Sequence, residues 1–142
     1  MAEESVVHTH RIPVRWSDFD MYRHMMNANY IELAQEARFA FAKDYFWSED
    51  ADFASVVRHL DVDFRYPLIW NGNHTVTVES QVTRVGNTSF TVYQEIKDTQ
   101  GTVTCVIECV QVVVNESTQL PRPLTDKEMD ILLNTAAVTV DE

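Results

Sequence analysis

The sequence predicts an α+β domain in which an antiparallel sheet of about five strands wraps around one long central helix, with a short C-terminal helix after it. A largely apolar stretch, 27–46, has helical periodicity, and four later runs have the apolar-polar alternation of strands. The connections between those runs are too short for parallel crossovers, which favours antiparallel pairing. A single sheet folded around a single helix buries the apolar surfaces of both.

The first part of the chain predicts a strand, a loop and the helix. Residues 6–16 read as an extended segment, where Pro13 suggests an edge position. Residues 17–26 break all periodicity and are rich in short polar residues, so a structured loop is expected. In 27–46 the apolar positions cover most of the helix surface, and we expect the helix to be mostly enclosed. One face of it holds Tyr30, Ala34, Ala37 and Phe41.

Four strands are expected after the helix, at 59–66, 76–82, 90–97 and 103–115. The last is apolar on both faces, as in a central strand or one at a subunit interface. The run from Thr125 to Glu128 then matches a capping box and predicts a helix to about Leu133. Residues 134–142 have no clear pattern, so a disordered tail is one interpretation of this segment. The whole of 1–142 is expected to be one domain.

The composition favours a cytoplasmic protein. The sequence has no run of about 18 apolar residues, as a membrane helix requires, and its first residues are acidic where a signal peptide is basic. Cys105 and Cys109 lie four residues apart in a predicted strand, a separation of about 13 Å at 3.3 Å per residue. This is too far for a disulfide, so we expect two buried, reduced thiols.

The formal net charge of −11 disfavours binding to nucleic acid or to an anionic membrane surface. An anionic ligand would meet the same repulsion and needs a local basic cluster. The candidates for that cluster are Arg58, Arg65, Arg84 and Lys97.

The most informative segment is 15–30, which reads RWSDFDMYRHMMNANY. It resembles the strand-to-helix signature of the 4-hydroxybenzoyl-CoA thioesterase-like family of the hotdog superfamily: an Asp-x-Asp pair, then His, Asn and Tyr. Arg23 stands where the family usually has Gly, and Met26 stands where the first Asn of a pair is common. The resemblance runs to about residue 124. Its further landmarks are Glu36-Ala37-Arg38, Arg65-Tyr66-Pro67-Leu68, Arg84 to Phe90 and Leu120 to Leu124.

This resemblance implies a hotdog-fold acyl-CoA thioesterase, which hydrolyses a thioester to a free acid and coenzyme A. Asp20 matches the family's catalytic Asp and would act as nucleophile or as general base. A backbone amide near Asn27, at the start of the long helix, would polarise the carbonyl. No metal or separate cofactor is implied, because coenzyme A enters only as part of the substrate.

Other residues have more than one interpretation. Asp18 and Glu36 are expected to be structural more than catalytic, and His8 with His10 is expected to be an exposed pair on the first strand. No third metal ligand lies near those two histidines in the sequence. The residues expected to bind substrate are His24, Arg65, Arg84, Thr88 and Ser89.

Two other functions stay open at this point. One is a non-catalytic hotdog module that binds acyl-CoA or an acyl carrier protein; the other is a hotdog dehydratase, for which Asp20 and His24 are the nearest acid–histidine pair. In each case a single sheet and helix leave a sheet edge uncovered. A homodimer or homotetramer is therefore expected, with the site at the subunit boundary.

Overall fold

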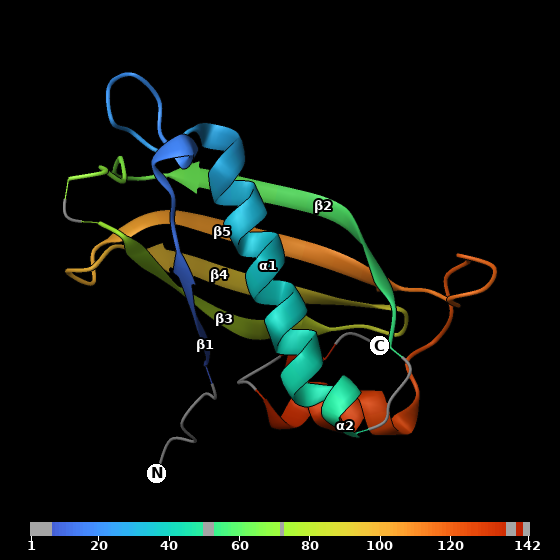
Figure 1. Cartoon of the computed structure of the whole chain (residues 1–142). Coiled ribbons are helices and arrows are strands. Elements are labelled where there is room, and N and C mark those ends of the chain that lie inside the picture. Colours follow the sequence, from blue (N-terminus) through green and yellow to red (C-terminus); the bar gives the residue numbers. More distant parts are fainter. Residues whose placement is uncertain (1–6, 50–52, 72, 136–138, 141–142) are drawn as a thin grey trace, which may run out of the picture.

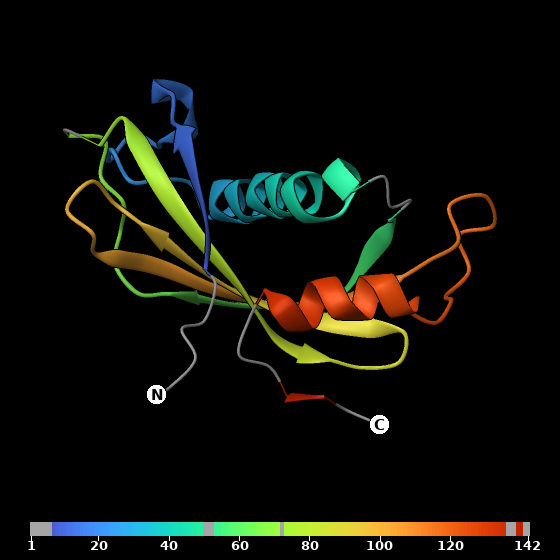
Figure 2. The ribbon, with the colours of Figure 1, turned by 90° about the horizontal axis from the view of Figure 1, so that it is seen from below.

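The computed structural model describes residues 7–49, 53–71, 73–135 and 139–140. A long helix, α1 (Asn27–Tyr45), lies across the concave face of a curved sheet (Figures 1 and 2), and a shorter helix, α2 (Asp126–Asn134), contacts β3 of that sheet. This is the predicted α+β architecture. In the described part of the chain, no helix is long and apolar enough to cross a membrane.

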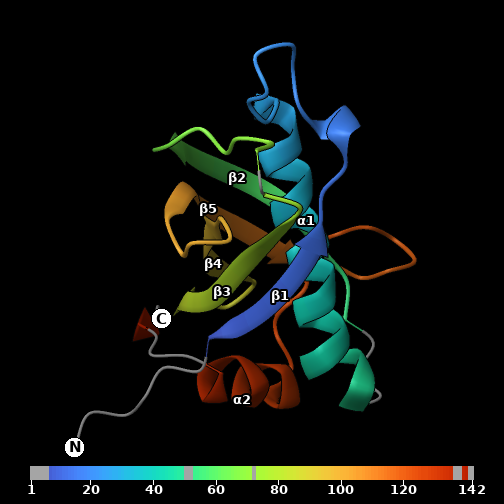
Figure 3. The ribbon, with the colours of Figure 1, turned by 60° about the vertical axis from the view of Figure 1, so that its left-hand side comes forward.

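The sheet has the strand order β1-β3-β4-β5-β2, and all neighbours in this order are antiparallel. β1 lies at one edge beside β3, as Pro13 predicted (Figure 3). After α1, β3, β4 and β5 are neighbours in chain order, whereas β2 lies at the other edge, where it pairs with β5 and not with β3. The strands are β1 (His8–Pro13), β2 (Ser55–Phe64), β3 (Thr75–Val85), β4 (Ser89–Lys97) and β5 (Val103–Val113); β6 (Thr139–Val140) pairs with β3 in parallel.

β2 differs most from its predicted bounds. It begins at Ser55 instead of residue 59 and ends at Phe64, so Tyr66 lies outside it. Its pairing with β5 shifts register between Val57 and His59. Such an irregularity breaks the period-2 pattern, so the first residues of β2 do not alternate in the sequence.

One face of α1 packs against the sheet. Ala34 and Ala37 are 0% exposed, and these small side chains let the helix approach the strands closely. The opposite face is open in this single chain, where Gln35, Glu36 and Phe39 are exposed. The helix is therefore enclosed on one side only, and the expectation that it is mostly enclosed is wrong for the isolated chain.

A polar network crosses the core between α1 and the sheet. Arg38 Nη1 donates to Gln94 Oε1 at 2.8 Å, and Gln94 Nε2 donates to the Ala34 carbonyl and to Ser80 Oγ, both at 3.0 Å. Gln94 is 0% exposed and Arg38 is 7% exposed. Burial lowers the pKa of Arg38 from its ordinary value. The network thus places a cation inside the domain.

Two local predictions are confirmed. Cys105 and Cys109 are buried free thiols, and burial raises the pKa of Cys105 to about 11. The capping box of α2 is complete: Thr125 Oγ1 accepts from the Glu128 amide at 3.1 Å, and Glu128 Oε1 accepts from the Thr125 amide at 2.9 Å. The cap fixes where α2 begins.

Candidate functional site

Asp18 fixes the path from β1 into α1. Its Oδ2 accepts from the Arg15 amide at 2.7 Å and its Oδ1 accepts from Asn29 Nδ2 at 2.9 Å. The residue is 8% exposed. A carboxylate this enclosed by its own hydrogen bonds positions the loop against the helix, which agrees with the structural role expected for Asp18.

Asp20 is held by the turn that follows it. Its Oδ1 accepts from the amides of Tyr22, at 2.8 Å, and His24, at 3.1 Å. The backbone amide of Asp20 also donates to the His24 carbonyl at 2.8 Å. Among the described residues, no donor bonds Oδ2, and the side chain is exposed. One oxygen therefore orients the carboxylate while the other is open to a ligand.

Arg23 occupies a backbone conformation that favours glycine. Its φ is 67°, in the left-handed region. Its amide donates to the Asp20 carbonyl and its carbonyl accepts from the Trp70 amide, both at 2.9 Å. This is the position where the resembling family usually has Gly, so the turn keeps that conformation even with a side chain present.

Arg23→Gly should stabilise the protein by up to about 1 kcal/mol, because a non-glycine residue at positive φ costs about 1 to 2 kcal/mol and glycine's greater freedom in the unfolded chain offsets part of that. Urea unfolding measures the free energy. Arg23→Ala is the matched control: it removes the guanidinium but keeps Cβ, and so should give no such gain. Equal stabilisation by both variants would show that the guanidinium, and not the backbone, carries the strain.

A cleft of about 270 Å³ opens between this turn, the start of α1 and the end of β2. It brings together four residues that the sequence placed in the site, Asp20, His24, Asn27 and Arg65. Aromatic and apolar side chains form the rest of the wall. They are Met25, Tyr30, Phe64, Tyr66 and Pro67.

The N-terminus of α1 is uncapped beside this cleft. The N-cap residue, Met26, makes no side-chain cap hydrogen bond, and no acidic residue lies in the first turn. Unsatisfied amides at a helix start present positive potential and bind anions or polarised carbonyls. Asn27 is both the first residue of α1 and part of the cleft wall. An anion or a carbonyl oxygen bound in the cleft would therefore lie close to the positive N-terminal end of α1.

Tyr30, the last residue of the 15–30 signature, lines the cleft but was not among the predicted site residues. It is 3% exposed, and burial raises its pKa. Its hydroxyl oxygen accepts from the Leu68 amide at 2.9 Å, so the O–H is available as a donor to a group in the cleft. The spacing of three residues from Asn27, which puts both on one side of the first helical turn, is the signal that could have identified it.

Three predicted substrate-binding residues lie elsewhere in the chain. Arg84 is near the end of β3, and Thr88 and Ser89 are at the turn into β4. This is the end of the sheet where β2 starts, with β5 between β4 and β2. The cleft is at the end of β2, and a ten-residue strand is roughly 30 Å long. One chain therefore does not bring these three residues to Asp20.

The proposed basic cluster is also dispersed. Arg65 lines the cleft, and its Nε donates to Asp63 Oδ2 at 2.9 Å, which raises its pKa. Lys97 donates to Glu79 Oε1 at 2.8 Å on β3. Arg58 is exposed on β2. Of the four candidates, only Arg65 lies beside Asp20.

The expectation of an exposed histidine pair on β1 is wrong for His8. Its side chain is 7% exposed, and Nε2 lies 2.6 Å from Asp44 Oδ2 near the end of α1. The rings of Phe41 and Tyr45 pack edge-on against it at 5.7 and 5.6 Å. Within the described ranges, no group of three or more His, Cys, Asp or Glu residues is arranged to hold a metal ion.

Comparison with known proteins gives consistent matches. The family model described as the thioesterase-like superfamily matches residues 14–132. Long-chain acyl-CoA thioesterase FadM of Escherichia coli is 30% identical over 74 residues, a segment that makes up 50% of this chain and only 56% of FadM.

Solved structures agree over nearly the whole chain. A predicted thioesterase from Bacillus stearothermophilus superposes with a TM-score of 0.80 at 27% identity, covering 94% of this chain and 98% of that one. A Staphylococcus aureus protein, SAV2348, solved in complex with CoA, has a TM-score of 0.81 at 16% identity, covering 95% of this chain and 87% of that one. The second likeness shows the fold alone.

Proposed function

Because this chain belongs to the thioesterase-like superfamily and has the hotdog fold, we propose that it is an acyl-CoA thioesterase that releases a free acid and coenzyme A. The observation that supports this best is a juxtaposition: the Asp20 carboxylate and the uncapped start of α1 line the same cleft. FadM acts on long-chain acyl-CoA, and the S. aureus structure contains CoA, which favours this class of substrate.

Thioester hydrolysis needs a base or nucleophile, and a hydrogen-bond donor that stabilises the oxyanion formed from the carbonyl oxygen. In the proposed reaction, Asp20 Oδ2 attacks the carbonyl carbon, or removes a proton from the water that attacks it. The carbonyl oxygen gains negative charge and is stabilised by an amide at the start of α1, near Asn27. The C–S bond then breaks and coenzyme A leaves as a thiolate that takes up a proton. In the nucleophilic case, water hydrolyses the resulting anhydride and restores Asp20.

These groups are sufficient for an ordinary enzyme. A well-placed hydrogen-bond donor to the oxyanion lowers the activation free energy by about 3 to 4 kcal/mol. General-base catalysis raises the rate by about 10² to 10⁴-fold. His24 and Tyr30 lie in the same cleft and would orient the thioester, with His24 also holding the turn that presents Asp20.

We further propose that the site is shared by two copies of the chain. If two β2 edges pair antiparallel about a twofold axis, the end of one strand meets the start of the other. This would carry the partner's β3–β4 turn, with Thr88 and Ser89, toward the Asp20 cleft. The edge and the open face of α1 carry exposed apolar side chains suited to such a contact. They are Phe39, Val56, Val57 and Phe64, which are 56%, 44%, 45% and 48% exposed.

Light scattering should therefore give a mass of at least twice the 16.4 kDa of the chain. Val57→Glu on the β2 edge should lower this mass and the hydrolytic rate together, because the added charge opposes pairing. Val7→Glu, an exposed valine near the opposite edge, is the matched control and should keep both. A wild-type mass near that of one chain would contradict the shared site.

The function itself is tested by thiol release from acyl-CoAs of graded chain length, including aromatic acyl groups, with wild type and Asp20→Asn. We expect turnover of at least one substrate class by wild type. Binding of acyl-CoA without turnover across the panel would favour a non-catalytic module, and hydration of an enoyl-CoA would favour a dehydratase.

A further inference from the structure

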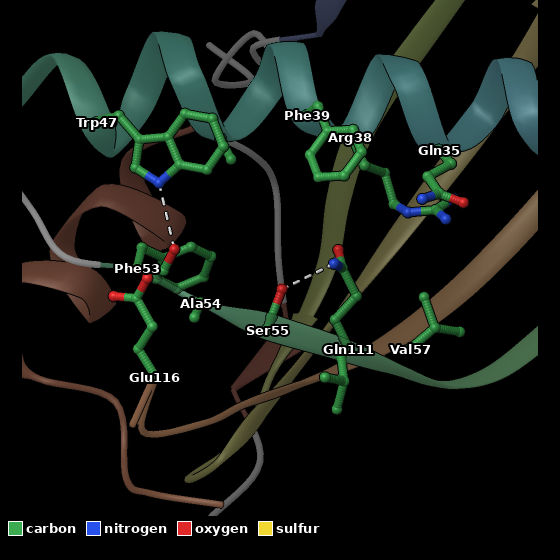
Figure 4. A pocket seen from close by; sticks show the side chains of 12 residues that line it. Gln35, Arg38, Phe39, Trp47, Phe53, Ala54, Ser55, Val57, Gln111 and Glu116 are labelled. Atoms are coloured by element: carbon green, nitrogen blue, oxygen red, sulfur yellow. Dashed lines mark hydrogen bonds between the residues drawn. The ribbon is translucent and has the colours of Figure 1, made fainter. Parts of the chain in front are cut away.

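A cavity of about 450 Å³ lies between α1 and the start of β2 (Figure 4). Phe39, Val56 and Val57 line it, and the same residues form the proposed contact between two copies of the chain. The cavity therefore belongs to that contact. The support of the Asp20 turn, in contrast, comes from within one chain.

The Asp20 turn is paired with a short segment of the loop between β2 and β3. Residues 23–25 lie antiparallel to residues 68–70, with His24 opposite Ile69. Two backbone hydrogen bonds of 2.9 Å each join these segments, from the Met25 amide to the Leu68 carbonyl and from the Trp70 amide to the Arg23 carbonyl. The His24 amide in turn donates to Asp20 Oδ1 at 3.1 Å. The position of the carboxylate therefore depends on this pairing.

The other side of the 68–70 segment is held by Asn73. Along an extended segment, successive residues direct their backbone groups to opposite sides. Leu68 and Trp70 bond to the Asp20 turn, as described above. The Ile69 carbonyl, which lies between them in the chain, accepts instead from Asn73 Nδ2 at 2.9 Å. The segment is thus fixed from both sides, by the turn and by one side chain.

The oxygen of the same side chain is anchored in the turn between β4 and β5. Asn73 Oδ1 accepts from the Thr99 amide at 3.1 Å and from Thr99 Oγ1 at 2.7 Å. That turn is itself closed by Asp98, whose Oδ1 accepts from two amides of the turn, both at 2.9 Å. One side chain therefore connects a hairpin of the sheet to the segment that holds the Asp20 turn.

Only a carboxamide serves both arms of this link. Its oxygen accepts and its nitrogen donates, whereas a carboxylate accepts only. Asn73 does not line the Asp20 cleft, so it does not touch a group bound there. Any effect of Asn73 on the reaction must pass through the 68–70 segment.

We propose that Asn73 is a positioning residue, which holds the Asp20 turn at the place where its carboxylate and the start of α1 act on the same carbonyl. The inference rests on the proposed function for its effect on rate. A misplacement of about 1 Å can lower an enzymatic rate about 10²-fold. Loosening the turn leaves the cleft and its other walls in place, so the effect falls on kcat and not on KM.

Asn73→Asp tests this with little change in shape. The carboxylate still accepts from Thr99, but the donor to the Ile69 carbonyl is lost. We expect kcat for acyl-CoA hydrolysis to fall about tenfold while KM stays within about twofold of its wild-type value. An unchanged kcat, or a loss that appears only in KM, overturns the proposal.

Asn71→Asp is the matched control, because it makes the same chemical change in the same loop. Asn71 is exposed, and within the described ranges its side chain makes no hydrogen bond. This variant adds the same charge without breaking the link and should keep the wild-type kcat. An equal fall in kcat for Asn71→Asp would assign the effect to charge and overturn the proposal.

Amide hydrogen exchange followed by NMR measures the pairing itself, without substrate. In Asn73→Asp the amides of Met25 and Trp70 should exchange at least about tenfold faster than in wild type, while that of buried Val92 in β4 keeps its rate. Unchanged exchange at Met25 and Trp70 overturns the proposal. If wild type hydrolyses no acyl-CoA, the proposed function fails, and exchange still decides whether Asn73 holds the Asp20 turn.

A second pair of variants covers the case in which Asn73→Asp does not fold. Thr99→Val removes the hydroxyl that donates to Asn73, and kcat should fall at least about threefold. Thr99→Ser keeps that hydroxyl and should match wild type. Equal kcat values for these two variants overturn the proposal.

Discussion

We expect Asp20→Asn to lower the rate of thioester hydrolysis by about 10² to 10⁴-fold and to leave acyl-CoA affinity near its wild-type value. The amide has the shape of the carboxylate, and its oxygen can still accept from the backbone amides of Tyr22 and His24. The turn should therefore keep its conformation. An uncharged amide neither attacks a carbonyl carbon nor takes a proton from water, so the effect should fall on kcat.

Asp130→Asn is the matched control for this result. Asp130 is an exposed carboxylate of α2 that does not line the Asp20 cleft, so its loss should leave hydrolysis unchanged. Thiol release measures the rate, and circular dichroism verifies that both variants are folded. Equal rates for wild type and Asp20→Asn would remove Asp20 from the mechanism.

Gln94→Leu should destabilise the protein by about 3 kcal/mol, the second large effect that the structure predicts. The side-chain amide of Gln94 is the acceptor for Arg38 and the donor to Ser80 and to the Ala34 carbonyl. Removing it leaves a buried cation without its acceptor and takes one donor each from Ser80 Oγ and the Ala34 carbonyl. Urea unfolding measures the loss.

The double variant Arg38→Met with Gln94→Leu separates the network from simple packing. Replacing both members by apolar side chains removes the unpaired charge, so the double variant should be more stable than Gln94→Leu alone. If the two single costs simply add in the double variant, Arg38 and Gln94 are not energetically coupled, and the free energy attributed to the network is wrong.

The sequence could predict the elements whose pattern is local. Helix α1 and the inward face of β3 and β4 follow from periodicity, and Val78 and Ile96 are fully buried as that pattern requires. The position of β2 beside β5 could not be predicted in this way. Alternation identifies which face of a strand is buried, but it carries no information about which strand lies next to it.

Long-range pairing also explains the main error in side-chain placement. His8 is a polar residue of a predicted edge strand and so looks exposed, whereas its partner Asp44 is 36 residues away on α1. The site was more predictable, since Asp20, His24 and Asn27 come from one continuous segment. Thr88 and Ser89 were placed from the family resemblance alone, and a single chain does not bring them near Asp20.

The central claim is that the helix start polarises the carbonyl that Asp20 attacks or hydrates. Infrared spectroscopy of an acyl-CoA with a ¹³C-labelled thioester carbonyl, bound to Asp20→Asn, tests this most directly because the substrate stays intact. We expect the C=O stretch of the bound thioester to lie at lower frequency than that of the free thioester, as for a carbonyl that accepts a strong hydrogen bond. A band for the bound thioester at the frequency of the free one would contradict the account.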